Sequence, residues 1–136
     1  MSWLDDPRVT AFENATVDPS AFGHREHLFV AWCYLKELPL EQAVARYVQH
    51  LQQLTRALGV PHKYHATLTW AYLVLLHNRM RAAELAAADF DTLMRCAPSL
   101  LDARTALCEF YDDSELHSDR ARSRFILPRR RPPAEP

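Results

Sequence analysis

Prolines divide this chain into short segments and so limit what it can fold into. A proline interrupts the interior of a helix but fits its first turn, so each proline marks a boundary between helices. Five of them are spread over the first hundred residues: Pro7, Pro19, Pro39, Pro61 and Pro98. Only two glycines occur, Gly23 and Gly59, which argues against tight β-hairpins and against glycine-rich phosphate loops. The sequence therefore predicts an all-α protein.

Apolar residues between the prolines recur with the period of an α-helix. The clearest case is residues 40–58, which Gly59 should end. Asp5 or Asp6 can cap a short first helix with Pro7 in its opening turn, and Ser20 can cap a second helix over residues 22–37. Further helices are expected over residues 63–88, 90–97 and 99–111, with a last turn or short helix after Ser118.

These segments predict one domain without internal repeats. A chain of 136 residues can bury a core without disulfide support. We expect a single-domain irregular bundle of about five to six helices over residues 1–127. A disordered tail rich in proline and arginine should follow over residues 128–136.

The cysteines and the charge distribution bear on the cellular location of the protein and on its partners. Cys33, Cys96 and Cys108 are widely spaced and lie in apolar-periodic stretches, which predicts buried thiols and a cytoplasmic location. No secretory signal and no membrane-spanning stretch is expected. Residues 118–136 carry a charge of +4 and the remainder −5. An acidic body and the absence of aromatic residues among the arginines of residues 128–136 disfavour a nucleic-acid partner, and homo-oligomers are not excluded.

Two histidines open the second predicted helix. His24 and His27 lie three residues apart, so their side chains share one face. Ala31 and Tyr34 continue that face. Two imidazoles at this spacing can bind one metal ion, and the first turn of a helix can also attract an anionic group of a substrate.

A third histidine opens the fourth predicted helix. His65, Thr69 and Tyr72 fall on one stripe of it. If successive helices run antiparallel, the second and fourth helices are parallel, and His65 then lies at the same end of the bundle as the first two histidines. His50, by contrast, faces away from the apolar stripe of its helix and is expected to be exposed to solvent.

Two sequence motifs resemble those of a family of small, uncharacterised, all-α bacterial proteins. The first is Phe22-Gly23-His24-Arg25-Glu26-His27-Leu28, and the second is Lys63-Tyr64-His65-Ala66-Thr67. The resemblance implies that His24, His27 and His65 belong to one site, but it implies no particular reaction. Ala66 stands where related sequences often have Glu, which puts any chemistry that needs that carboxylate in doubt here.

These patterns lead to a first hypothesis and two alternatives. The first is a metal-dependent enzyme for a small molecule, with Zn, Fe or Cu held by His24, His27 and His65. Substrate would be positioned, or a proton donated, by one or more of four side chains: Tyr34, Tyr64, Thr69 and Tyr72. The alternatives are a non-enzymatic helical protein that binds a small molecule or a partner, and a metal-free enzyme with a histidine general base.

Overall fold

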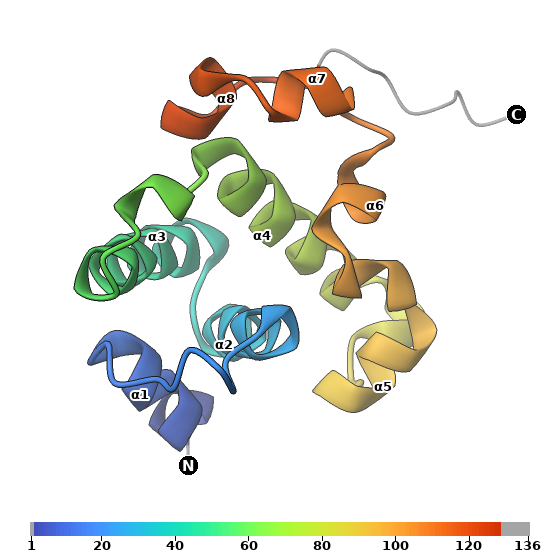
Figure 1. Ribbon diagram of the computed structural model, residues 1–136. Coiled ribbons are helices and arrows are strands. Elements are labelled where there is room, and N and C mark those ends of the chain that lie inside the picture. Colours follow the sequence, from blue (N-terminus) through green and yellow to red (C-terminus); the bar gives the residue numbers. More distant parts are fainter. Residues whose placement is uncertain (1, 129–136) are drawn as a thin grey trace, which may run out of the picture.

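The computed structural model describes residues 2–128, and every regular element in this range is a helix or a helical turn (Figure 1). The α-helices are α1 (Pro7–Glu13), α2 (His24–Glu37), α3 (Leu40–Ala57), α4 (Ala66–Arg81), α5 (Phe90–Cys96), α6 (Ala103–Leu107), α7 (Asp113–Leu116) and α8 (Asp119–Ser123). Four 3-10 turns connect them: η1 (Trp3–Asp5), η2 (Pro61–Lys63), η3 (Ala83–Leu85) and η4 (Pro98–Leu101). The predicted all-α class is confirmed. The predicted tail lies, apart from Pro128, outside the described residues.

Several helix ends follow directly from local chemistry. The side chain of Asp6 caps α1 by accepting a hydrogen bond from the backbone N–H of Arg8 at 2.9 Å, and Pro7 fills the first turn. Gly59 follows α3 with a positive φ of 73°, a conformation that glycine adopts without strain. Ser118 caps α8, as expected.

Other predicted boundaries are wrong. The cap of α2 is Gly23, whereas Ser20 hydrogen-bonds to Asp18 in the preceding turn. The fourth helix is shorter than predicted because Tyr64 and His65 are extended at its start and Ala82 is extended at its end. Residues 99–111 form η4 and the short helix α6 instead of one continuous helix.

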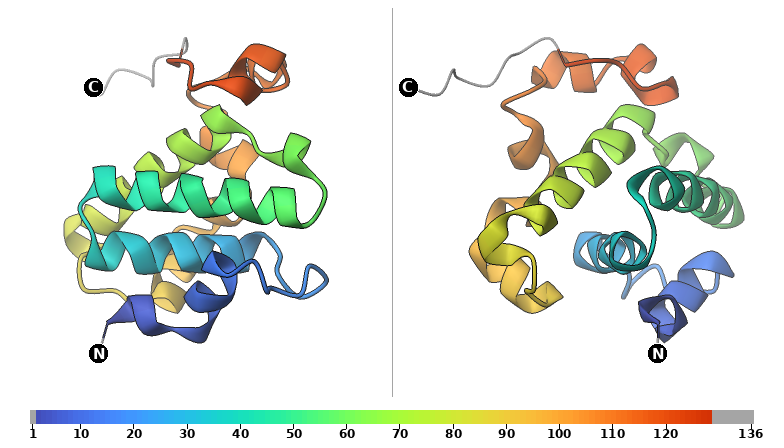
Figure 2. Two further views of the ribbon diagram at one scale, coloured as in Figure 1. Left: turned by 90° about the vertical axis from the view of Figure 1, so that its left-hand side faces the viewer. Right: turned by 180° about the vertical axis from the view of Figure 1, so that it is seen from behind.

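Helix α2 is the centre of the fold. All eight of its residues from Leu28 to Leu35 are buried, so this stretch is enclosed on every side. It packs against η1, α1, α3, α4 and η4. Helices α2 and α3 lie side by side and run antiparallel, and α4 crosses them obliquely (Figure 2). An all-round apolar helix needs neighbours on each face, which explains why the short elements gather around α2.

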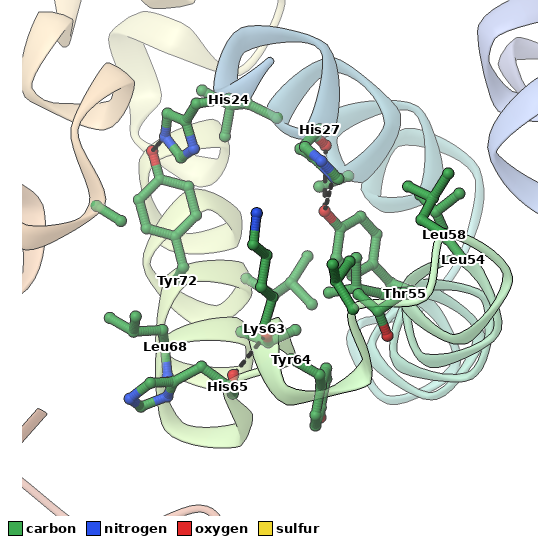
Figure 3. Close-up of a pocket in the computed structure, with 18 residues that line it drawn as sticks. His24, His27, Leu54, Thr55, Leu58, Lys63, Tyr64, His65, Leu68 and Tyr72 are labelled. Atoms are coloured by element: carbon green, nitrogen blue, oxygen red, sulfur yellow. Dashed lines mark hydrogen bonds between the residues drawn. The ribbon is translucent and has the colours of Figure 1, made fainter. Parts of the chain in front are cut away.

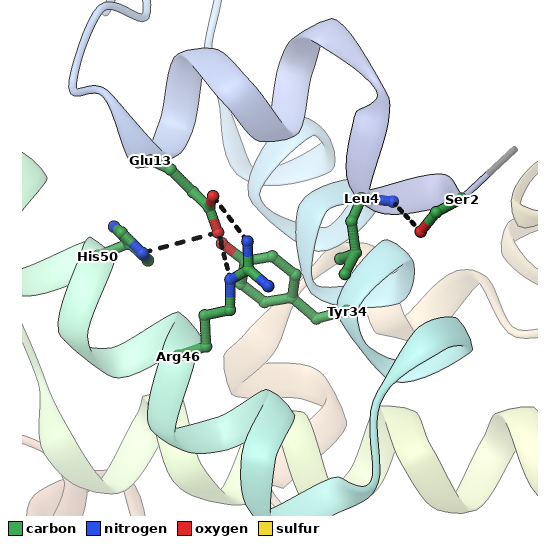
Figure 4. A network of polar contacts seen from close by, with 6 residues as sticks. All are labelled: Ser2, Leu4, Glu13, Tyr34, Arg46 and His50. Carbon is green, nitrogen blue, oxygen red and sulfur yellow. Dashed lines mark hydrogen bonds and ion pairs between the residues drawn. The ribbon is translucent and has the colours of Figure 1, made fainter.

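A polar network joins α1, α2 and α3 on the far side of α2 from α4 (Figure 4). The carboxylate of Glu13 accepts hydrogen bonds from the buried hydroxyl of Tyr34 and from Arg46, whose Nε lies 2.6 Å away. His50 Nε2 lies 3.6 Å from the same carboxylate, and its Nδ1 is buried. The expected exposure of His50 is therefore wrong, because α1 covers this part of α3.

Glu13 is the group on which this network depends. Burial by itself would raise the pKa of Glu13. The hydrogen bonds from Arg46 and Tyr34 and the charges of Arg46 and His50 outweigh burial, so the pKa lies below its ordinary value of 4.5. A lowered carboxyl pKa stabilises the folded state above pH 4.5, and this contribution is lost as the pH falls through the folded-state pKa.

Replacing Glu13 should therefore destabilise the protein in a pH-dependent way. We expect Glu13→Gln to lower the free energy of unfolding by about 1–3 kcal/mol at pH 7, because charge-assisted hydrogen bonds are lost. The difference from wild type should shrink as the pH falls below 4.5. Urea denaturation at several pH values measures it, with Glu41→Gln on the exposed surface of α3 as control. An equal difference at all pH values would contradict the assignment.

Candidate functional site

A cavity of about 370 Å³ lies between α2, α3 and α4 and is closed at one side by η2 and the residues next to it (Figure 3). The surface of its wall is mainly apolar, and half of the lining residues have apolar side chains: Leu28, Ala31, Leu51, Leu54, Leu58, Val60, Leu68, Leu73 and Ala103. Its polar side chains are His24, His27, Tyr47, Thr55, Lys63, Tyr64, His65, Thr69 and Tyr72. The volume is in the range of small-molecule sites, and so is the combination of an apolar wall with a few polar groups.

The first turn of α2 brings two histidines to the cavity. His24 Nε2 lies 3.3 Å from the hydroxyl of Tyr72 and 3.3 Å from the carbonyl oxygen of Leu100. A carbonyl oxygen only accepts hydrogen bonds, so the neutral His24 ring is best satisfied with its proton on Nε2. Its Nδ1 is then left as an acceptor.

His27 is more deeply buried than His24. Its Nδ1 lies 3.4 Å from the hydroxyl of Tyr47, and its ring packs edge-on against Phe12 and Phe22. Burial, assisted by the nearby His24, lowers the pKa of His27 to about 4, so the ring is neutral at pH 7. The Tyr47 hydroxyl also lies 3.5 Å from the carbonyl oxygen of His27, the alternative acceptor for its proton. When Tyr47 donates to Nδ1, the ring proton of His27 is on Nε2, and that N–H is a hydrogen-bond donor for a ligand.

His65 has a different environment. It is the cap of α4: its Nδ1 accepts a hydrogen bond from the backbone N–H of Leu68 at 3.1 Å. Nε2 must then carry the proton, and it donates to the carbonyl oxygen of Leu116, 2.6 Å away. Burial lowers the pKa of His65, with a contribution from the charge of Arg122. Both ring nitrogens are therefore engaged: Nδ1 caps α4, and Nε2 joins α4 to α7.

Of the four other predicted site residues, three line the cavity and one does not. Tyr64, Thr69 and Tyr72 line the cavity, although the Thr69 hydroxyl donates to the carbonyl oxygen of His65 at 2.7 Å. Tyr34 does not line it, and its hydroxyl donates to Glu13 further along α2. Tyr34 is seven residues beyond His27 and so lies on the same stripe, but about 10 Å further along the helix.

A three-histidine metal centre does not fit these side chains as they stand. Within residues 2–128, no group of three or more His, Cys, Asp or Glu side chains is arranged to hold a metal ion. His65 would first have to give up its hydrogen bond with Leu68 or Leu116. His24 and His27 remain near each other and near the cavity.

Sequence reasoning missed two polar residues of the cavity. Tyr47 lies within the helix expected over residues 40–58, and its hydroxyl meets His27. Lys63 follows Pro61 in the turn η2, and Figure 3 shows its side chain directed into the space between His24 and His27. The motif that contains Lys63 drew attention to His65 instead, and helical periodicity has no signal for a residue in a turn.

Comparison with protein-family models, curated proteins and solved structures found no match to the chain. The function must therefore be argued from the cavity and from the side chains that line it.

The double role of His65 as cap and as link predicts a graded loss of stability. We expect His65→Ala to cost about 1–3 kcal/mol of unfolding free energy, because a helix cap and a buried hydrogen bond are both removed. His65→Asn should recover part of the loss, because Asn caps a helix but is too short to reproduce the bond to Leu116. Urea denaturation measures both variants. A fully stable His65→Ala protein would contradict this role.

Proposed function

We propose that the protein binds a small organic molecule in the cavity between α2, α3 and α4. The observation that supports this is the composition of the wall, in which leucines from three helices surround a few polar side chains. An apolar ligand of matching size would replace water along this wall, and each buried CH₂ group contributes about 0.8 kcal/mol.

The polar residues can orient such a ligand. Tyr47 and Tyr72 lie on opposite helices, α3 and α4, and each is paired with a histidine of α2. Burial raises the pKa of Tyr47 and of Tyr72 above the ordinary value of 10, so both hydroxyls keep their protons at neutral pH. They therefore act as hydrogen-bonding groups for a bound molecule.

Binding is favoured over histidine general-base catalysis by the environment of His27. An efficient general base has a pKa near the working pH. A pKa of about 4 makes His27 a weak base at pH 7, although it remains a good hydrogen-bonding group. His27 is thus better suited to hold a ligand by a hydrogen bond than to act as a general base.

A cytoplasmic location belongs to the same proposal. Cys33 is a buried free thiol, and Cys96 is an exposed free thiol that a reducing compartment would preserve. The prediction of buried cysteines is wrong for Cys96 and Cys108, which are exposed. None of the helices described in residues 2–128 is long and apolar enough to span a membrane.

Binding can be tested with octanol as a neutral apolar probe. We expect one molecule to bind with a dissociation constant of about 0.1–1 mM, as the burial of a short alkyl chain offsets the cost of association. Thr55→Trp should reduce the affinity at least about tenfold by filling the cavity. Isothermal titration calorimetry gives both values.

The matched control places the same side chain on the outer face of α3. Gln53 lies two residues from Thr55 and is exposed. The Gln53→Trp variant should therefore bind octanol with the affinity of the wild type. Circular dichroism and thermal melts establish that both variants are folded. Equal loss of binding in both variants, or no binding by folded wild type, would overturn the proposal.

The metal hypothesis has its own test. A centre at His24, His27 and His65 predicts about one ion per chain after loading with Zn(II), Fe(II) or Cu(II) and desalting. The double variant H24A/H65A should then lose that ion. Substoichiometric metal in the loaded wild type would contradict the hypothesis, and elemental analysis measures it.

A further inference from the structure

We infer that the molecule bound in this cavity is an organic monocarboxylate, with its carboxylate beside Lys63 and His27 and its alkyl or aryl body against the leucines. This inference rests on the proposed function, because it names the class of ligand for the same cavity. It follows from which charged groups line the cavity and which do not.

The lining contains hydrogen-bond donors and one cationic side chain but no carboxylate. Of the described residues that line it, none is Asp or Glu. Lys63 supplies an ammonium group, and the hydroxyls of Tyr64 and Tyr72 are donors. A carboxylate accepts from all of these, whereas an ammonium ligand would meet Lys63 without a compensating negative charge.

Of the lysines and arginines that the structure describes, only Lys63 lines the cavity. The sequence contains two lysines, Lys36 and Lys63, and fourteen arginines. Within residues 2–128, Lys63 forms no ion pair, and Figure 3 shows its amine directed between the two histidines of α2. Lys36 lies outside the cavity, with its amine 5.5 Å from the ring centre of Trp32.

The carboxylates of Asp102 and Glu26 interact electrostatically with His24 and His27, respectively, but both residues lie outside the cavity. Asp102 interacts electrostatically with His24, but its carboxylate caps α6 and accepts hydrogen bonds from Arg104 and Thr105. Glu26 lines a separate groove on the outer side of α2 together with Trp3. Neither carboxylate therefore neutralises Lys63 within the cavity.

The charged side chains that line the cavity also favour a single carboxylate over a phosphate or a dicarboxylate. Sites for doubly charged groups usually bring several cations together, and arginine is the preferred residue for bidentate contacts. No described arginine lines this cavity, although arginines are seven times as frequent as lysines in the sequence. One ammonium group, one imidazole N–H and a largely apolar wall match a monoanion with an apolar body.

Three ligands of one length test the inference: octanoate, octanol and octylamine, titrated into the wild-type protein at pH 7.5 by calorimetry. We expect octanoate to bind about five- to tenfold more tightly than octanol, and octylamine no more tightly than octanol. Lys63→Met should bring the ratio of octanoate affinity to octanol affinity close to one. Lys63→Arg should retain most of the wild-type preference for octanoate. Lys36→Met removes the same charge outside the cavity and should leave the wild-type ratio unchanged.

The outcomes separate this inference from the proposed function. Equal binding of octanoate and octanol, or tightest binding of octylamine, would overturn the carboxylate inference and leave the cavity as a binding site. A preference for octanoate that persists in Lys63→Met would also overturn it. Failure of all three ligands to bind folded wild-type protein would overturn the proposed function itself.

Discussion

The complete burial of the middle of α2 is the constraint on which the rest of this structure depends. A helix that exposes one face can lie on the surface of a bundle, but the stretch from Leu28 to Leu35 must be covered all round. Burying a large apolar side chain contributes about 1.5–3 kcal/mol, so the short elements around α2 owe their stability mainly to this contact. Helices as short as α1 and α5, with seven residues each, would be marginal without it.

The cavity is a consequence of where that burial stops. The first turn of α2 extends beyond the fully enclosed stretch, so His24 and His27 are only partly covered. Because α4 crosses obliquely, it approaches this turn at Tyr72 instead of at its own first residues. Space is left between the three helices, and the small side chain of Ala31 preserves it. The position of the cavity is thus set by helix packing, and its polarity is set by the residues at the helix starts.

The fold could be predicted from the sequence because its signals are local. Proline positions, the Gly59 stop and the period of residues 40–58 each act within a few residues, and the helices followed them. The start of α4 could not be predicted from local signals, since the side chain of His65 is held by a hydrogen bond to Leu116, 51 residues away. His27 and Tyr34 share a helix face, and both rings pack against Phe12. Of the two, only His27 lines the cavity, and helical periodicity does not indicate how far along a helix a cavity extends.

The histidines show most clearly what a local pattern leaves open. A histidine at the start of a helix can direct its ring to a ligand, or it can use Nδ1 to cap the helix, and both arrangements have the same spacing in the sequence. At His65 the cap is combined with a bond to a carbonyl, so no lone pair is left for another partner. At α2 the cap is Gly23, which has no side chain, and the two histidines that follow it remain directed toward the cavity and its tyrosines. The identity of the cap residue therefore separates the two histidines directed toward the cavity from the histidine that holds the fold together.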